Sequence, residues 1–380
     1  MSISESEIQD FQRQASAWMA ENKPDDPGFL LPQSFMEVGN ERQLDFLREW
    51  QHKLWTGGYL GLAWPREYGG GGMDPVFQSI ADREMRNHDV PICFNVIGLG
   101  WAGPLINDIG TEEEKARYLK GILSAEDIWC QGFSEPDHGS DLGSAQTRAL
   151  RDGDEYVVNG TKIWTTLGNF ARYMILLART NPEAERKYDG LSFFLAPMDV
   201  TGVETRPIRK LTGEYGFTET FFTDARIPAN CRMGEEGQGW RIAMQTLQYE
   251  RGAEAGAAGG LMIVRTAIDD VIEGLRATRM DDQPVLSDPV VRDELVRLIM
   301  EEKAVALGDR RMAVSALTTD YPGSLPLSHK LRWTEYSRRM RQLAVNLQGA
   351  AGGLYVGDDH VPGGGFWQRA YFNNFSTTIG

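Results

Sequence analysis

The stretch from Trp129 to Thr166 combines turn-forming residues, small hydroxyl side chains and a tryptophan near the end of a predicted strand. It begins Trp129-Cys130-Gln131-Gly132-Phe133-Ser134-Glu135-Pro136, continues Asp137-His138-Gly139-Ser140-Asp141, and ends Ile163-Trp164-Thr165-Thr166. Serine, proline, aspartate and glycine favour turns, and a tryptophan offers a flat face on which an aromatic ring can stack. This composition predicts a site that holds a flat cofactor.

Simpler interpretations exist for the same residues. For Trp164 the alternative is a core tryptophan, because strands bury large side chains. Thr165 and Thr166 alone would be ordinary β-branched strand residues. For Ser134 and Ser140 the alternative is turn formation, which is compatible with cofactor binding because cofactor loops are themselves turns.

A second candidate for chemistry is the acidic residue in Leu247-Gln248-Tyr249-Glu250-Arg251-Gly252. Ala243, Leu247 and Glu250 fall at positions i, i+4 and i+7, which places Glu250 on the apolar, inward-facing stripe of a helix. A buried carboxylate is costly unless it is paired or functional, and burial raises the pKa of a carboxyl group towards the range of a general base. Glu250 is therefore a candidate proton acceptor. A structural ion pair with an arginine, or an exposed side chain, is the alternative.

The charge of the chain limits the class of partner. Its 380 residues include 39 basic and 54 acidic side chains, a net charge of -15 at pH 7. This balance argues against nucleic acid or an anionic membrane as the main partner, so bound phosphates would need local donors. The N-terminus has no signal-peptide pattern, and no run approaches the roughly 18–20 apolar residues of a membrane span.

The cysteines predict neither disulfides nor a metal site. Cys93, Cys130 and Cys231 lie far apart and form no Cys-x-x-Cys pair, so a disulfide framework and a zinc site are both unexpected. Together with the N-terminal pattern, this predicts reduced thiols in a cytoplasmic protein.

Three regions of different periodicity must position these residues, which predicts an α+β multidomain protein. Residues 1–126 are helical in pattern, with apolar residues such as Leu47, Trp50 and Leu54 at three- and four-residue steps. Residues 127–230 contain short strands and tight turns, which predicts an antiparallel β-barrel, with a sandwich as the alternative. Residues 231–380 return to long helices with short connections, which predicts a C-terminal four-helix-bundle-like domain.

Within these regions the pattern also predicts individual elements. Asn159-Gly160 is expected to form the tight turn of a hairpin between residues 156–158 and 161–164. Further strands are expected at residues 173–177, 191–195 and 219–222. The long helical segments of the C-terminal region are expected at residues 239–278, 288–318 and 327–351.

One motif match is expected to be misleading. Gly98-Leu99-Gly100-Trp101-Ala102-Gly103 has the G-x-G-x-x-G spacing of a dinucleotide-binding turn. That spacing has meaning only between the strand and helix of a βαβ unit, and helical pattern lies on both sides here. We expect close helix packing at small residues and no nicotinamide-binding fold.

Taken together, the motifs resemble those of the acyl-CoA dehydrogenase family of flavoproteins. The resemblance covers essentially the whole chain, including the order of helical, strand and helical regions. The residues that carry it are Ser134-Glu135-Pro136, Gly139-Ser140-Asp141, Trp164-Thr165-Thr166, and Glu219, Phe222 and Asp224 ahead of Ile227-Pro228.

The resemblance implies FAD bound against the barrel. Trp164 would stack on the flavin, Thr166 would hydrogen-bond its N5 edge, and Ser140 would lie near the pyrophosphate and the acyl-CoA. The full set of implied cofactor-binding residues is Gln131, Phe133, Ser134, Ser140, Trp164, Thr165 and Thr166.

The implied activity is α,β-dehydrogenation of an acyl-CoA thioester to a 2-enoyl-CoA. Glu250 would remove the α-proton, and the β-hydrogen would leave as hydride to the flavin. The isovaleryl- and long-chain-specific branches and bacterial enzymes for steroid side chains resemble this placement of the base. Ser140, Tyr249 and Arg251 are the implied substrate-binding residues. Electrons would pass to an electron-transferring flavoprotein.

Two departures from the family pattern bear on partners. The family's Arg-x-x-Phe-Gly motif reads Thr278-Arg279-Met280-Asp281-Asp282, and its Gln-x-x-Gly-Gly-x-Gly motif reads Asn346-Leu347-Gln348-Gly349-Ala350-Ala351-Gly352. In the family these motifs reach the FAD of a neighbouring subunit. The chain is therefore expected in a homotetramer or, because the motifs are altered, in a heterotetramer. A mainly structural subunit and an acyl-CoA oxidase-like enzyme are the alternatives.

The C-terminal residues are expected to lack the base. Many members of the family take their catalytic glutamate from a loop after the helical bundle. Here that region reads Phe375-Ser376-Thr377-Thr378-Ile379-Gly380 and contains no glutamate.

Overall fold

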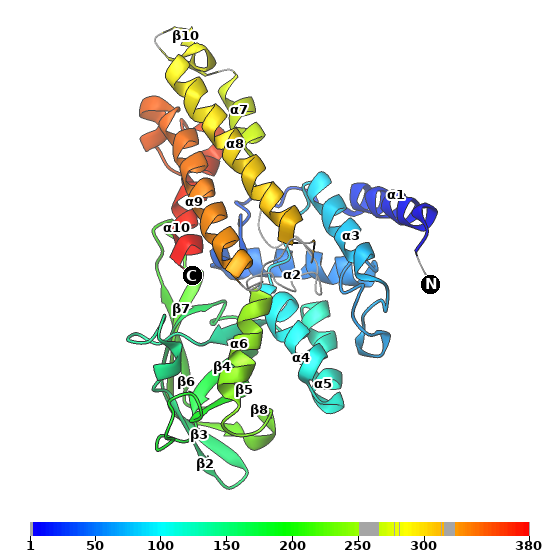
Figure 1. Cartoon of the computed structure of the whole chain (residues 1–380), viewed down its shortest axis with the longest axis vertical. Helices are drawn as coiled ribbons and strands as arrows, with labels where there is room; N and C mark the ends of the chain where they lie inside the picture. The colour runs from blue at the N-terminus through cyan, green and yellow to red at the C-terminus, as the bar shows by residue number, and fades with distance from the viewer. Residues whose placement is uncertain are drawn as a thin grey trace. The chain divides into compact units, whose positions relative to one another are not determined.

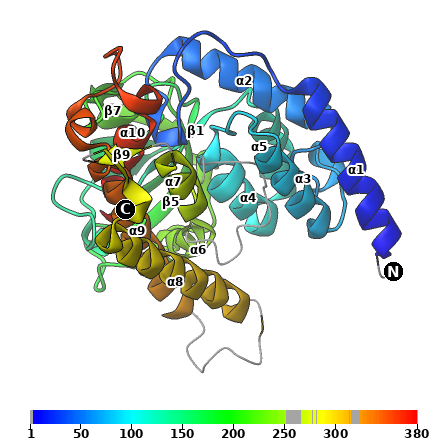
Figure 2. The same cartoon turned by 90° about the horizontal axis from the view of Figure 1, so that it is seen from above.

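The computed structural model describes residues 3–250 and 266–379, apart from residues 277, 281, 313 and 315–323. The chain divides into two compact units, Met1–Val264 and Arg265–Gly380. Figure 1 and Figure 2 follow the chain from blue at the N-terminus to red at the C-terminus. Each unit is described separately below.

The first unit begins with helices that start at well-defined capping residues. Ser4 and Thr111 each accept a hydrogen bond from the backbone N–H of a glutamate three residues later, whose carboxylate accepts from the cap's own N–H. Asp74 caps a helix that opens on Pro75. These helices confirm the predicted helical start: α1 (Glu5–Asn22), α2 (Glu41–Thr56), α3 (Pro75–Asn87), α4 (Gly103–Ile109) and α5 (Glu112–Ser124).

The glycine-rich run at residues 98–103 lies within helical structure. Ile97–Ala102 forms a π-helix, η3, that continues directly into α4. A Cβ added at Gly103 would lie 2.1 Å from Cη2 of Trp64, so glycine is required where the indole packs against the helix. The spacing of a dinucleotide-binding turn is a packing feature here, as predicted.

The middle of the first unit is an eight-stranded sheet with the order β6-β7-β3-β2-β4-β5-β8, and β1 pairs with β4. Neighbouring strands are antiparallel, except that β1 and β2 each run parallel to β4. The strands predicted at residues 173–177, 191–195 and 219–222 lie in β4, β5 and β7. The bounds are β1 (Trp129–Gly132), β2 (Arg148–Asp152), β3 (Glu155–Thr166), β4 (Tyr173–Arg179), β5 (Leu191–Pro197), β6 (Val203–Ile208), β7 (Phe217–Pro228) and β8 (Arg232–Met233).

Both faces of strand β4 are buried. Side chains alternate between the two faces of a sheet. Ile175 and Leu177 belong to a core shared with the N-terminal helices, whereas Met174 and Leu176 belong to a second core within the sheet domain. This double burial explains why the sequence of β4 is almost continuously apolar.

The predicted hairpin turn at Asn159-Gly160 is wrong, because both residues lie inside the long strand β3. The turn between β2 and β3 is at residues 153–154, where Gly153 has a φ of 64°. Asn159 and Gly160 instead mark a bulge in the pairing of β3 with β7. The Asn159 amide exchanges hydrogen bonds of 3.0 and 2.9 Å with Asp224 across that bulge.

Helix α6 (Gly239–Glu250) follows the sheet and still belongs to the first unit. The second unit contains α7 (Ile268–Leu275), the ribbon β9 (Arg279–Met280) and β10 (Gln283–Pro284), α8 (Pro289–Met312), α9 (Ser324–Asn346) and α10 (Phe366–Ile379). Apolar residues of α7, α8 and α9 share one core, and α9 packs against α8 and α10 (Figure 1). The helical, sheet and helical regions thus follow the predicted order. The boundaries near residues 126 and 230 stay predictions.

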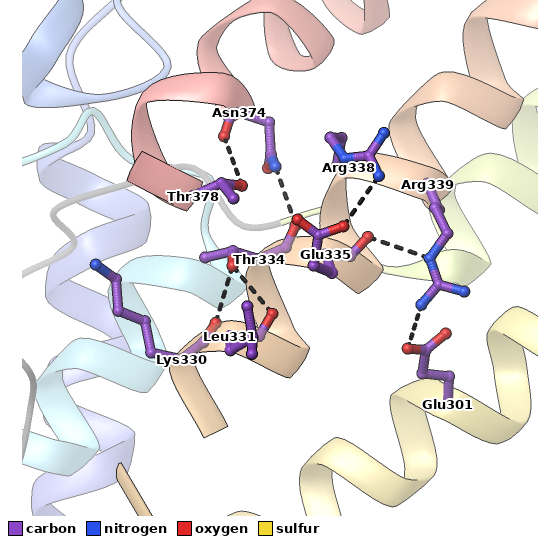
Figure 3. A network of polar contacts seen from close by, with 9 residues as sticks. All are labelled: Glu301, Lys330, Leu331, Thr334, Glu335, Arg338, Arg339, Asn374 and Thr378. Carbon is purple, nitrogen blue, oxygen red and sulfur yellow. Dashed lines mark hydrogen bonds and ion pairs between the residues drawn. The ribbon is translucent and has the colours of Figure 1, made fainter. Parts of the chain in front are cut away.

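Helix α10 was not predicted, and residues 375–379 belong to it instead of to a loop. Its period is hidden because buried positions carry polar side chains: Gln368, Arg369 and Asn374 are at most 2% exposed. The Asn374 amide donates to the Thr334 carbonyl of α9 at 3.1 Å (Figure 3) and accepts from Arg341. Hydrogen bonds between two helices therefore take the place of an apolar stripe.

Candidate active site

Trp164 lies at an irregularity of β3 with its ring in solvent. The pairing of β3 with β7 is interrupted between Lys162 and Thr165, and Trp164 has a φ of 60°, which is unfavourable for a residue with a side chain. The residue is 56% exposed, and its ring meets the edge of Phe217 with centroids 6.0 Å apart. The core alternative is therefore wrong. Strained backbone that presents an exposed aromatic face is typical of a ligand site.

The two threonines that follow Trp164 point to different surroundings. The Thr165 and Thr220 hydroxyl groups share a hydrogen bond of 3.0 Å, and the Thr165 carbonyl accepts from Thr218 at 3.0 Å. The Thr165 side chain and carbonyl are thus both engaged within the sheet, and its predicted contact with a cofactor stays a prediction. Thr166 is the last residue of β3 and is largely buried.

Gln131 and Glu250 are brought together by the fold. Gln131 lies on β1 and Glu250 is the last residue of α6. Gln131 Nε2 donates to Glu250 Oε2 at 3.4 Å, a long hydrogen bond. The other amide atom of Gln131, Oε1, is buried and has no hydrogen-bond partner among the described residues. The predicted base and a predicted cofactor-binding residue are therefore neighbours.

Helix α6 packs its apolar face against the rest of the first unit, and this packing brings Glu250 close to Gln131. Ile242, Ala243 and Tyr249 are buried, while Glu250 is half-buried at the helix end. The Tyr249 hydroxyl donates to Asp108 Oδ2 of α4 at 3.1 Å, so this side chain is directed to α4. Arg251 lies outside the described residues, and its predicted substrate contact stays a prediction.

The remaining predicted residues line the loop that follows β1. The Phe133 ring is buried and packs against the Phe193 ring, with centroids 5.9 Å apart. The Ser134 carbonyl accepts from the Ile163 N–H at 2.9 Å, which joins the loop to β3. Ser140 lies further along the loop and is exposed.

A buried ion pair beneath this loop was missed in the sequence. Lys162 Nζ lies 2.8 Å from Glu135 Oε1, and the two side chains are 0% and 5% exposed, respectively. Burial raises the pKa of Glu135, but Lys162 and two backbone N–H groups outweigh it, so the pKa is lowered overall. Burial also lowers the pKa of Lys162, against the pull of Glu135. The signal was available, because Lys162 shares the inward phase of Tyr156 and Val158 on β3.

These features fit a planar cofactor next to a proton acceptor. Trp164 offers an exposed ring, and the buried Gln131 Oε1 can accept a hydrogen bond from a ligand N–H. A half-buried carboxylate, Glu250, lies within reach of the same amide. Chemically, these groups offer a face for stacking at Trp164, a hydrogen-bond acceptor at Gln131 and a proton acceptor at Glu250.

The two altered motifs lie in the second unit. Arg279 and Met280 form β9, and Asp282 has a φ of 62° in the turn before β10. Asn346 ends α9, and Gln348 accepts a hydrogen bond from Gln368 Nε2 at 2.7 Å. Gln348 is therefore engaged within its own unit.

Three family models match the chain in sequence. They describe the N-terminal domain of acyl-CoA dehydrogenase at residues 32–126, the middle domain at residues 130–225 and the C-terminal domain at residues 237–379. The three matches follow one another in the order of the helical, sheet and helical regions. Among the described residues, no helix has the length and hydropathy needed to cross a membrane.

Known proteins are similar over nearly the full chain. The acyl-CoA dehydrogenase IpdE1 of Mycobacterium tuberculosis is 34% identical over 382 residues, which cover 98% of this chain and 93% of that protein. A solved structure described as the Tcur3481-Tcur3483 steroid ACAD has a TM-score of 0.77 and 29% identity, covering 100% of this chain and 94% of that one. The ChsE4-ChsE5 complex from Mycobacterium tuberculosis has a TM-score of 0.76 and 25% identity, with coverage of 100% and 94%.

Proposed function

Because the chain belongs to the acyl-CoA dehydrogenase family of FAD-dependent flavoproteins, we propose that it converts an acyl-CoA to a 2-enoyl-CoA with Glu250 as base. Members of this family are oxidoreductases that act on CH–CH groups. The observation that carries the assignment of the base is the hydrogen bond between Gln131 Nε2 and Glu250 Oε2. This bond joins the carboxylate to β1, the strand that leads into the loop whose residues carry the family motif.

The proposed roles of the protein groups follow from their positions. Glu250 takes the proton from the carbon next to the thioester carbonyl, and the Gln131 amide orients its carboxylate. Trp164, with its exposed ring, would pack against the flavin ring, and Thr166, the last residue of β3, would hold its edge. Bound FAD supplies the acceptor for the hydride that leaves the neighbouring carbon, so that a carbon–carbon double bond forms.

The surroundings of Glu250 favour this transfer in two ways. The carboxylate is half-buried, so water competes less for it than at an exposed site. Tyr249 and Gln245 both donate to Asp108, at 3.1 and 2.5 Å, and these bonds hold the last turn of α6 against α4. We therefore assign Tyr249 to the wall of the substrate site, with its hydroxyl group held by Asp108.

Replacing Glu250 by glutamine tests the base. Glutamine keeps the shape of the side chain but cannot accept the proton, so the rate of flavin reduction by a good acyl-CoA should fall by about 10²–10⁴-fold. FAD content should stay that of the wild type. Glu235→Gln is the matched control, because Glu235 is 82% exposed and lies before α6. Undiminished flavin bleaching in Glu250→Gln would remove Glu250 from its role.

For the substrate we propose an acyl-CoA with a fused-ring, steroid-type acyl group. The support is the 29% identity, over the full chain, to a solved protein described as a steroid ACAD. Anaerobic flavin bleaching should be about tenfold faster or more with such a thioester than with short, medium or long straight chains. Equal rates across that panel, or a preference for straight chains, would contradict this substrate class.

For the assembly we propose a heterotetramer with a second subunit of the same family. The support is the altered sequence at residues 278–282 and 346–352, together with two solved relatives described by paired protein names. Co-expression with such a subunit should give a yellow complex of defined mass. A chain that is a yellow homotetramer alone would contradict the mixed assembly. A colourless chain that contributes no base to the complex would favour the structural subunit.

We propose an electron-transferring flavoprotein as the electron acceptor. The oxidase alternative predicts hydrogen peroxide in stoichiometric amount during turnover in air, whereas a dehydrogenase needs the added acceptor. The cytoplasm is the proposed compartment, since the three cysteines, Cys93, Cys130 and Cys231, are buried and form no disulfide.

A further inference from the structure

One buried ion pair joins two segments of the proposed flavin site. Lys162 Nζ lies 2.8 Å from Glu135 Oε1 and donates to the Phe133 carbonyl at 3.0 Å. The Glu135 carboxylate also accepts from the backbone N–H groups of Gln146, at 2.6 Å, and Thr147, at 2.9 Å. The pair thus fixes three backbone groups from the two ends of the loop after β1.

This pair lies where the sheet stops holding β3. Lys162 is in register with β7, but the pairing is lost until Thr165. On the other side of β3, the Ile163 N–H donates to the Ser134 carbonyl at 2.9 Å. The backbone that leads into Trp164 is therefore held from the loop and not from β7. The loop must be fixed if Trp164 is to keep its left-handed conformation.

A second buried cation holds the far part of the same loop. The Arg179 guanidinium donates to the carbonyls of Ala145, Gly143 and Lys187, each at 3.0 Å. Arg179 is 8% exposed. Lys162 and Arg179 thus both hold the loop at residues 133–147 by donating hydrogen bonds to its backbone carbonyls.

Stability alone does not explain the Glu135–Lys162 pair. Desolvation of two buried charges largely offsets their attraction, and apolar residues of similar volume often stabilise a fold equally well. Apolar residues cannot, however, hydrogen-bond the three backbone groups that the pair holds. What the pair adds is a fixed geometry of the loop.

We propose that Glu135 and Lys162 are a positioning pair that fixes the loop after β1 against the strained end of β3, so that Trp164 and Thr166 are set for the flavin ring. The proposal rests on the proposed function for the identity of the ligand. The two residues touch neither flavin nor substrate in this scheme. They act through the backbone of the residues that do.

The test is the double variant Glu135→Gln/Lys162→Met in the full-length protein, with its partner subunit if one is needed for FAD. Glutamine keeps one acceptor oxygen, for one of the two loop N–H groups, and methionine keeps the volume of the lysine stem. Neither of the two positions then carries a charge. The dissociation constant for FAD should rise by about tenfold or more, with a shifted flavin absorption spectrum. In cofactor-free protein, amide hydrogen exchange at residues 133–147 should be about tenfold faster.

Arg226→Met is the matched control. Arg226 forms exposed ion pairs of 2.8 Å with Glu155 and Asp152 at the other end of the β3–β7 ladder. The Arg226→Met substitution removes one cation from the same pair of strands. The dissociation constant for FAD and the rate of amide hydrogen exchange at residues 133–147 should nevertheless change by less than about twofold. If the double variant does not fold, Glu135→Asp is the milder variant, because it keeps a carboxylate for Lys162 on a shorter side chain, and an intermediate effect is expected.

The outcomes separate this proposal from the proposed function. Wild-type FAD affinity and unchanged loop exchange in a folded double variant would overturn the positioning role. Faster loop exchange together with weaker FAD binding supports it. If the wild type binds no FAD under any condition, the proposed function fails, and the exchange measurement alone decides whether the pair fixes the loop.

Discussion

Two polar networks in this molecule hold the chain in different ways. In the first unit, the Glu135–Lys162 pair is buried and bonds to the backbone of a loop. In the second unit, the network on α9 lies partly in solvent (Figure 3): Arg338 and Glu335 are 2.9 Å apart with side chains 31% and 36% exposed. Arg339 of the same helix pairs with Glu301 of α8.

The difference follows from what each backbone can do for itself. A helix satisfies its own N–H and C=O groups, so charged side chains on α9 add only small increments of stability. A loop has no ladder of its own, and its buried backbone groups must find other partners. Buried charge beneath a loop therefore sets geometry, whereas half-exposed charge on a helix adjusts stability.

The largest effect is expected from removing one partner of the buried pair. Lys162→Met leaves the Glu135 carboxylate buried without its cation, which should lower the free energy of unfolding by about 3–5 kcal/mol at neutral pH. Urea unfolding followed by circular dichroism measures it. The double variant with Glu135→Gln should recover most of the loss, because neither of the two positions then carries a buried charge. If the Lys162→Met protein is as stable as the wild type, the proposed difference between the buried network and the half-exposed network is wrong.

The pH dependence sharpens the same comparison. In the wild type the folded pKa of Glu135 is lowered, so its contribution is present above the unfolded pKa and is lost as pH falls through the folded pKa. In Lys162→Met, burial without the cation should raise that pKa, so stability is lost as pH rises through it. The difference in the free energy of unfolding between the wild type and Lys162→Met should therefore become smaller at acidic pH. A difference in the free energy of unfolding that is the same at about pH 5 and about pH 7 would contradict this account.

An intermediate effect is expected at the buried part of the second network. Asn374→Ala removes the amide that joins α10 to the Thr334 carbonyl and to Arg341. The free energy of unfolding should fall by about 1–3 kcal/mol, because buried polar groups lose a partner. Thr378→Ala is the control in the same helix, since the Thr378 hydroxyl donates within α10, to the Asn374 carbonyl at 3.4 Å (Figure 3). Equal effects of the two substitutions would mean that the inter-helix amide contributes little.

The smallest effect is expected at the half-exposed pair. Arg338→Gln breaks the contact with Glu335, which is three residues earlier on α9. The expected loss is about 0.2–0.5 kcal/mol, and it should shrink further in high salt. Thermal unfolding at two salt concentrations checks it. A loss comparable to that of Lys162→Met would show that exposure does not separate the networks.

Periodicity and motif spacing predicted much of the fold, whereas the roles of the site residues stay predictions. The phase of Ala243 and Leu247 predicted that Glu250 turns inward, and its carboxylate is half-buried and accepts from Gln131. Residues 129–166 correctly indicated the family because the motif residues are close in sequence. Local pattern is sufficient when the contacts that matter are local or lie along one face of one element.

The errors arose where tertiary contacts override local preference. Asn159-Gly160 has the chemistry of a turn, but the Asn159 amide is used to bridge a bulge to Asp224. Helix α10 was hidden because Asn374 and other polar residues occupy its buried face. The partner of Tyr249 is Asp108, on a helix far away in sequence, which no local spacing can indicate.

The π-helix η3 makes the number of residues in this region as important as their identity. A π-helical turn contains about one residue more than an α-helical turn. Deleting one residue between Ile97 and Ala102 would restore α-helical pairing and turn α4 by about 100° against the segment before it. Asp108 would then leave Gln245 and Tyr249, to which it is now bonded at 2.5 and 3.1 Å. The position of α6, which ends in Glu250, therefore depends on the number of residues between Ile97 and Ala102, far earlier in the sequence.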